Sequence, residues 1–294
     1  MRGFTFITGV TTQASILSAL SLVDLTLDEK YASICGFTEA DLNSLFPDYM
    51  EEMLEILKTK GASPPEATIT NLKKLITDWY DGYTWDGQTK IFDPWSILHA
   101  FERNLFGDYW SQTGGVPTFL VNLVQTGLVD FNVFRVKISI IKSLNRILLG
   151  QTLTLIPLLF QSGYLTVDKI DKSKIISVFH LRIPNLEVKA GIIQLLLSME
   201  PIKQPLAAWE KACRMVSSLI KLDAEGFENA FGSFLAEFPD SSQAPPEAYY
   251  HSLFQAALLL ADAKIDSEVF GGIYERVAIN QDHRKTLVTS QLFK

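Results

Sequence analysis

The middle of the chain carries residues with the types and spacing of a metal-dependent nuclease site. Glu187-Val188-Lys189 matches the Glu-x-Lys pattern, and Asp171 lies upstream as a candidate second carboxylate. Hydrolysis of a phosphodiester by this route needs two acidic ligands for Mg²⁺ and a lysine near the attacking water. Ile183-Pro184-Asn185 ends a strand and starts a helix just before Glu187, so the pair is expected on a helix rather than a sheet strand. We therefore predict no catalytic residue and no metal ligand in this chain.

Two other stretches could bind a ligand. Asp81 and Asp86 lie among the aromatic residues of the 79–98 segment, where they could act as ligands beside an aromatic wall. The alternative is a packed loop, because two Asp-Gly pairs reverse the chain and the aromatic side chains would fill a core edge. Gly114-Gly115 could cradle a phosphate, but the Gly-x-x-x-x-Gly-Lys-Ser/Thr pattern is absent. We favour the packed loop and a tight glycine turn.

Charge is unevenly distributed along the chain. The net charge is −7, yet residues 131–190 hold nine Lys or Arg against three Asp or Glu, a local excess of six positive charges. Such an excess is a reason to expect a contact with a polyanion such as nucleic acid, although a solvated surface gives similar counts. The candidate contacts are the lysines of a predicted hairpin tip: Lys169, Lys172 and Lys174.

The elements that must position these residues are mainly helical. Thr38 with Asp41 predicts a capping box, and Asp93-Pro94 predicts a helix start. Strands at 164–167 and 175–184, joined by a turn over 168–174, follow a helix at 153–161 that Gly163 ends, which suggests a winged-helix arrangement. A strand at 264–270 precedes a tail without period, which we expect to be exposed or frayed. The other expected helices span 28–31, 38–45, 48–60, 69–79, 118–124, 138–149, 206–222, 224–238 and 247–263.

Composition places the chain among globular proteins. Hydrophobic residues make up 47% and charged residues 20%, so disorder is not expected. No run approaches 18 uninterrupted apolar residues, which argues against a transmembrane helix and a membrane partner. Cys35 and Cys213 are far apart and fit a reducing compartment, so we expect buried thiols and a cytoplasmic location. The apolar run 4–10 at the start resembles a buried strand without neighbours, so we expect the chain to begin inside a domain.

Five short motifs occur in order along the chain. They are Phe6-Ile7-Thr8-Gly9-Val10, Leu25-Thr26-Leu27-Asp28 with 31–38, Trp79-Tyr80-Asp81-Gly82-Tyr83, Asp93-Pro94-Trp95-Ser96-Ile97 and Ile183-Pro184-Asn185-Leu186-Glu187-Val188. Their combination, over roughly residues 4–273, resembles the bacterial AAA-ATPase-like family that is fused to a C-terminal PD-(D/E)xK nuclease-like domain.

The resemblance implies a mostly α, α+β fold with three regions. Residues 1–130 would be the C-terminal part of an AAA-ATPase-like domain with a helical lid, 131–200 a winged-helix-like region with a β-hairpin, and 201–294 a helical linker with a partial nuclease-like domain. Thr8 matches a sensor-like position and is the one nucleotide-facing candidate. Glu247 and His251 would lie on the first helix of the nuclease-like domain, which should continue past residue 273 with Gly-Arg-x-Asp and Glu-x-Lys strands.

The sequence differs from that family at the motifs that carry the family's catalytic chemistry. The family's P-loop, Walker-B-like acid and nuclease Glu-x-Lys strand are not found, and a reading-frame change near residue 273 would explain the last loss. ATP and Mg²⁺ serve the full-length family, whereas we expect no cofactor for this chain. We expect a truncated protein without autonomous catalysis. The alternatives are a nucleic-acid or protein binding module that uses residues 131–190, and a residual ATP-binding or nuclease enzyme.

Overall fold

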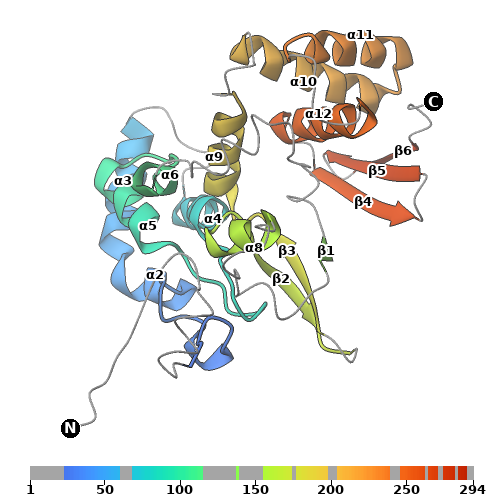
Figure 1. Cartoon of the computed structure of the whole chain (residues 1–294). Coiled ribbons are helices and arrows are strands. Elements are labelled where there is room, and N and C mark those ends of the chain that lie inside the picture. Colours follow the sequence, from blue (N-terminus) through green and yellow to red (C-terminus); the bar gives the residue numbers. More distant parts are fainter. Residues whose placement is uncertain are drawn as a thin grey trace. The chain divides into compact units, whose positions relative to one another are not determined.

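The fold is described by a computed structural model for residues 23–59, 68–114, 137–138, 155–173, 177–197, 204–238, 246–261, 264–270, 274–281 and 284–289. Helices form most of the regular structure in these ranges, together with two three-stranded antiparallel sheets (Figure 1). The expected mostly helical α+β class is therefore confirmed. Contacts between Cα atoms divide the chain into two compact units, Met1–Gly114 with Val136–Ala190, and Gly115–Arg135 with Gly191–Lys294. The three regions suggested by the family resemblance remain a prediction.

Helices of the first unit begin where the sequence places their caps. Thr38 caps α2 (Glu39–Leu45) in a capping box, since its hydroxyl accepts the N–H of Asp41 and the Asp41 carboxylate accepts the N–H of Thr38. Asp93 caps α5 (Pro94–Arg103) with one hydrogen bond, since its carboxylate accepts the backbone N–H of Ser96. The other helices described in this unit are η1 (Glu29–Tyr31), α3 (Pro47–Thr59), α4 (Ile69–Tyr80), α6 (Trp110–Gly114) and α8 (Leu155–Gln161).

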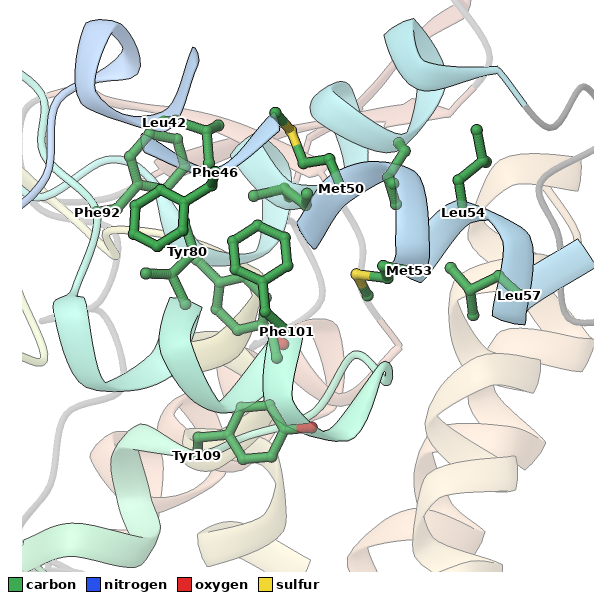
Figure 2. Close-up of a cluster of buried hydrophobic side chains, with 14 residues drawn as sticks. Leu42, Phe46, Met50, Met53, Leu54, Leu57, Tyr80, Phe92, Phe101 and Tyr109 are labelled. Carbon is green, nitrogen blue, oxygen red and sulfur yellow. The ribbon is translucent and has the colours of Figure 1, made fainter. Parts of the chain in front are cut away.

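An apolar core holds α2, α3, α4 and α5 together (Figure 2). Met53 of α3 and Tyr80 of α4 are fully buried, and Phe46 stacks on Phe101 of α5 with ring centroids 5.4 Å apart. Apolar residues at helical spacing form one apolar face on each helix, and burial of these faces is the main contribution to the stability of the folded unit. The buried residues are Met50, Met53, Leu54 and Leu57 in α3, and Leu72, Ile76 and Tyr80 in α4.

A small antiparallel sheet completes the first unit. It contains β1 (Lys137–Ile138), β2 (Thr166–Asp171) and β3 (Val178–Arg182) in the order β1-β3-β2. The expected hairpin is present, but the expected turn is wrong over residues 168–171, because β2 continues to Asp171 through a register shift between Val167 and Lys169. The expected helix over 138–149 is also wrong at Ile138, which pairs with Phe179 of β3. Residues 139–149 lie outside the described residues.

The described residues of the second unit include three long helices and a second sheet. α9 (Leu186–Leu197) begins in the first unit and ends in the second. Rings of Phe227 and Phe231 on one helix meet Phe254 on another, and Lys211 forms a part-buried ion pair with Glu237. These helices are α10 (Pro205–Lys221), α11 (Ala224–Leu235), which Asp223 caps, and α12 (Pro246–Leu260).

The C-terminal part of the chain is more ordered than its sequence suggests. The expected strand over 264–270 is confirmed as β4 (Lys264–Phe270). The tail is expected to be exposed or frayed, and fraying is wrong for its described residues, because β5 (Tyr274–Gln281) and β6 (Arg284–Thr289) follow β4 and pair in the order β4-β5-β6. Hydrogen bonds to neighbouring strands impose this extended backbone, even though the side chains there show no clear apolar alternation.

Candidate functional site

Glu187 of the Glu-x-Lys pattern lies in the first turn of α9, as the sequence predicts. The Asn185 side chain accepts the N–H of Val188 at 3.0 Å and so opens the helix after β3. Because the helix begins here, the Glu187 side chain points into the first unit, where it is fully buried. Its Oε1 accepts the backbone N–H groups of Tyr109 and Trp110 at 2.8 and 2.9 Å. The carboxyl thus joins the start of α9 to the start of α6.

The buried setting changes the acidity of this carboxyl. Burial raises the pKa of Glu187 to about 7, and the charge of Asp93 adds to the rise, while contacts with Trp110, Ser96 and Tyr109 oppose it. Its Oε2 is buried without a hydrogen-bond partner. The Ser96 hydroxyl is near enough to favour the charged form, but its geometry falls short of a hydrogen bond. Glu187 therefore titrates near neutral pH, in a place closed to solvent.

The proposed partners of Glu187 do not form a metal site with it. Asp171 ends β2 and accepts the N–H and the hydroxyl of Ser173 at 2.9 and 2.6 Å. Within the described residues no group of three or more His, Cys, Asp or Glu side chains could hold a metal ion. Mg²⁺ prefers several oxygen ligands and retains bound water, which a fully buried carboxylate bonded to two amides does not offer. The described residues therefore do not fit the Mg²⁺ that the family resemblance implies.

The two aspartates of the aromatic segment serve its backbone. Asp86 accepts the N–H groups of Gln88 and Thr89 at 2.8 and 2.7 Å, and the hydroxyls of Thr84 and Thr89 as well. Burial raises its pKa, but these hydrogen bonds outweigh burial and leave the pKa of Asp86 below its usual value. Burial raises the pKa of Asp81, whose Oδ1 has no hydrogen-bond partner. The contacts of Asp86 are those of a packed loop, the alternative that the sequence favoured.

This aromatic loop is attached to the β2–β3 hairpin. Thr84 and Thr166 exchange hydrogen bonds, from the Thr84 N–H to the Thr166 hydroxyl at 2.8 Å and from that hydroxyl to the Thr84 carbonyl at 2.7 Å. Arg182 donates to the carbonyls of Gly82 and Pro184. Sequence reasoning counted Arg182 only as a positive charge, since nothing local reveals that it reaches a loop 100 residues away.

Two of the three hairpin lysines lie among the described residues, and they occupy different places on the hairpin. Lys169 lies within β2 and is exposed. Lys172 follows the strand, and its Nζ lies 2.7 Å from Oε1 of Glu29, with both side chains exposed. Lys174 and Thr8 lie outside the described residues, so their proposed roles stay predictions. His180 of β3, which the sequence did not single out, has a buried Nδ1 without a hydrogen-bond partner.

The structure also describes the positions of Gly114, Glu247, His251 and the two cysteines. Gly114 is the last residue of α6, so the expected glycine turn is wrong there, and Gly115 lies outside the described residues. Glu247 and His251 are both on α12. Both cysteines are free thiols; the expected burial is wrong for Cys35, which is exposed. No helix among the described residues has the length and hydropathy to cross a membrane.

Comparison with known proteins adds one related sequence. A curated relative from Azotobacter chroococcum mcd 1, described as an uncharacterized protein in the vnfD 5' region, is 28% identical over 294 residues. The match covers 95% of this chain and 52% of the relative, so the chain spans about half the length of that protein. No family model and no solved structure matches the chain.

Proposed function

We propose that this chain is a non-catalytic portion of an AAA-ATPase-like and PD-(D/E)xK nuclease-like protein, without ATPase or nuclease activity of its own. The state of Glu187 carries the proposal. Its carboxyl is fully buried and holds two backbone N–H groups, so it acts as a structural link between α6 and α9 rather than as a metal ligand. The absence of a P-loop pattern from the sequence supports the same proposal, because phosphoryl transfer depends on that cradle.

The test compares the purified chain with its longer relative from Azotobacter. Equilibrium dialysis with Mg-ATP and a DNA cleavage assay are run on both proteins and on Glu187→Gln of this chain. We expect no nucleotide uptake and no cleavage by this chain. DNA cleavage that the Glu187→Gln substitution abolishes, in protein that still folds, would show that Glu187 is catalytic and would overturn the proposal. The relative shows whether the longer protein has an activity that this portion lacks.

A second candidate function is a binding module for nucleic acid that uses residues 131–190. The exposed positions of Lys169 and Lys172 favour it, because lysines that bind phosphates must reach solvent. In both proposals we place the protein in the cytoplasm, since its two free cysteines fit a reducing compartment.

A further inference from the structure

Three helices begin around the buried carboxyl of Glu187. Its own helix, α9, starts one residue earlier at Leu186, and its Oε1 accepts the N–H groups of Tyr109 and Trp110 at the start of α6. Ser96, in the first turn of α5, has a buried hydroxyl near enough to favour the charged carboxyl. The starts of α5, α6 and α9 therefore meet at one titratable group.

The ionisable groups that face this carboxyl are an acid and several tyrosines. Burial and then the charge of Asp93, at the start of α5, raise the pKa of Glu187. Glu187 also interacts electrostatically with Tyr80 of α4, Tyr83 of the aromatic loop and Tyr109. No lysine or arginine among the described residues forms an ion pair with Glu187. A negative charge here would have only hydrogen-bond donors to stabilise it, and a buried charge without a partner is costly.

Other charged groups lie farther from the carboxyl. Asp108, just before α6, is a second buried acid, and Lys189 follows Glu187 on α9. His99 and Arg103 of α5 both lie against the ring of Tyr109, at 5.8 and 5.3 Å from its centroid. Histidine is the residue type that ordinarily changes charge between pH 5 and 8. His99 is therefore the group whose titration must be separated from that of Glu187.

The two helices that Glu187 joins carry the chain between the compact units. α6 ends at Gly114, the last residue of the first unit before the chain enters the second. α9 crosses from the first unit to the second between Ala190 and Gly191. The remaining crossing lies outside the described residues. One buried carboxyl is thus bonded at the start of each described connection.

We propose that Glu187 is a pH-sensitive switch: its neutral carboxyl holds the starts of α6 and α9 together, and its ionisation favours a local opening that separates them. The opening breaks two backbone hydrogen bonds and lets water reach the carboxylate, so it requires neither hydrophobic core to unfold. The inference rests on the structural role that the proposed function gives to Glu187, and it adds a regulation of that role by protons.

The test measures hydrogen exchange of the Tyr109 and Trp110 amides by NMR in the full chain. Protection factors remove the intrinsic pH dependence of exchange. They should fall by up to about tenfold per pH unit between pH 5 and 7 and then level off, about a hundredfold in all by pH 8. Low concentrations of urea should change them little, because a local opening exposes little surface.

Substitutions assign the pH dependence to a group. Glu187→Gln stays neutral and can accept both N–H groups, so it should abolish the pH dependence. Ser96→Ala removes a hydroxyl that favours the charged carboxyl and should move the midpoint to higher pH, which a merely structural role would not do. Glu52→Gln makes the same charge change at an exposed position of α3 and should leave the profile unchanged. His99→Gln should also leave it unchanged.

Three outcomes would overturn the inference. Constant protection of the two amides from pH 5 to 8 would show that Glu187 is no switch. A pH dependence that survives in Glu187→Gln and disappears in His99→Gln would assign it to the histidine. If urea lowers the protection of Tyr109 and Trp110 as steeply as that of amides in α3, the opening is global unfolding. None of these results involves DNA or nucleotide, so the proposed lack of catalysis stands or fails separately.

Discussion

The carboxyl of Glu187 fills a structural need that arises at the start of a short helix. The first N–H groups of a helix have no partner within it, and those of Tyr109 and Trp110 are satisfied by one buried oxygen. Burial of the carboxylate removes it from water, which disfavours its charged form and raises the pKa of Glu187 to about 7. The protonated acid therefore fits this environment better than the ion does.

Glu187 should make the stability of the chain depend on pH. Its pKa is about 7 in the folded chain, against an ordinary value of 4.5 for a glutamate, so between these pH values the folded state binds more protons than the unfolded state. The free energy of unfolding should therefore fall by up to roughly 3 kcal/mol as pH rises from about 4.5 to 7. Glu187→Gln stays neutral and can still accept both N–H groups, so urea denaturation at pH 5 and pH 8 should show a weaker pH dependence.

Glu187→Ala is the matched control for that experiment. It leaves two buried N–H groups unpaired and opens a cavity, so we expect a loss of about 2–4 kcal/mol at both pH values. If Glu187→Gln keeps the full pH dependence of the wild-type chain, another group is responsible for it.

At the scale of elements, the aromatic loop and the β2–β3 hairpin form one assembly. Gly82 makes the approach possible, because it adopts φ +118° and a Cβ there would lie 2.3 Å from the carbonyl oxygen of Pro184. The Thr84–Thr166 exchange and the Arg182 contact with Gly82 close the same junction. The hairpin is thereby held at its base, while its far end carries Lys172.

Gly82→Ala should damage this junction. The added methyl group meets backbone, which cannot rotate away as a side chain could, and the positive φ disfavours any L residue. We expect a loss of roughly 2 kcal/mol or more in the free energy of unfolding, measured by chemical denaturation. Gly232→Ala in α11 is the control, because its Cβ meets nothing within 4 Å, and it should gain up to about 1 kcal/mol. Equal effects of the two substitutions would contradict the prediction.

On the scale of the whole molecule, each compact unit has buried aromatic side chains of its own. Phe92 and Tyr80 are fully buried in the first unit, as is Phe234 in the second, where its ring lies 4.9 Å from that of Phe238. A unit with its own hydrophobic core can in principle fold by itself. A substitution in one core should therefore speed up hydrogen exchange mainly in the unit that contains that core.

Phe234→Ala tests this expectation. Truncation of a fully buried phenylalanine should cost about 3–5 kcal/mol, and hydrogen exchange should speed up mainly in α10, α11 and α12. Phe92→Ala is the reciprocal control, with the largest change expected in α3, α4 and α5. If either substitution accelerates exchange uniformly across both units, the two cores unfold as one cooperative system instead.

Local sequence determined the parts of this protein that depend on neighbouring residues. The capping box at Thr38, the helix start at Asp93-Pro94 and the start of α9 after Asn185 follow from side chains within four residues of the backbone groups that they satisfy. The expected helices over 48–60 and 69–79 likewise correspond to α3 and α4. Helical periodicity and capping depend on residues that are close together in the sequence, so both can be predicted from the sequence alone.

Tertiary structure alone decided what the charged residues do. Nothing near Glu187 in the sequence shows that its oxygen meets two N–H groups 77 and 78 residues away. The register shift between Val167 and Lys169 and the strands β5 and β6 depend on partner strands, because a ladder takes its register and hydrogen bonds from another segment of the chain. The sequence thus supplied the chemical groups, and long-range contacts decided which are buried in structural roles and which face solvent.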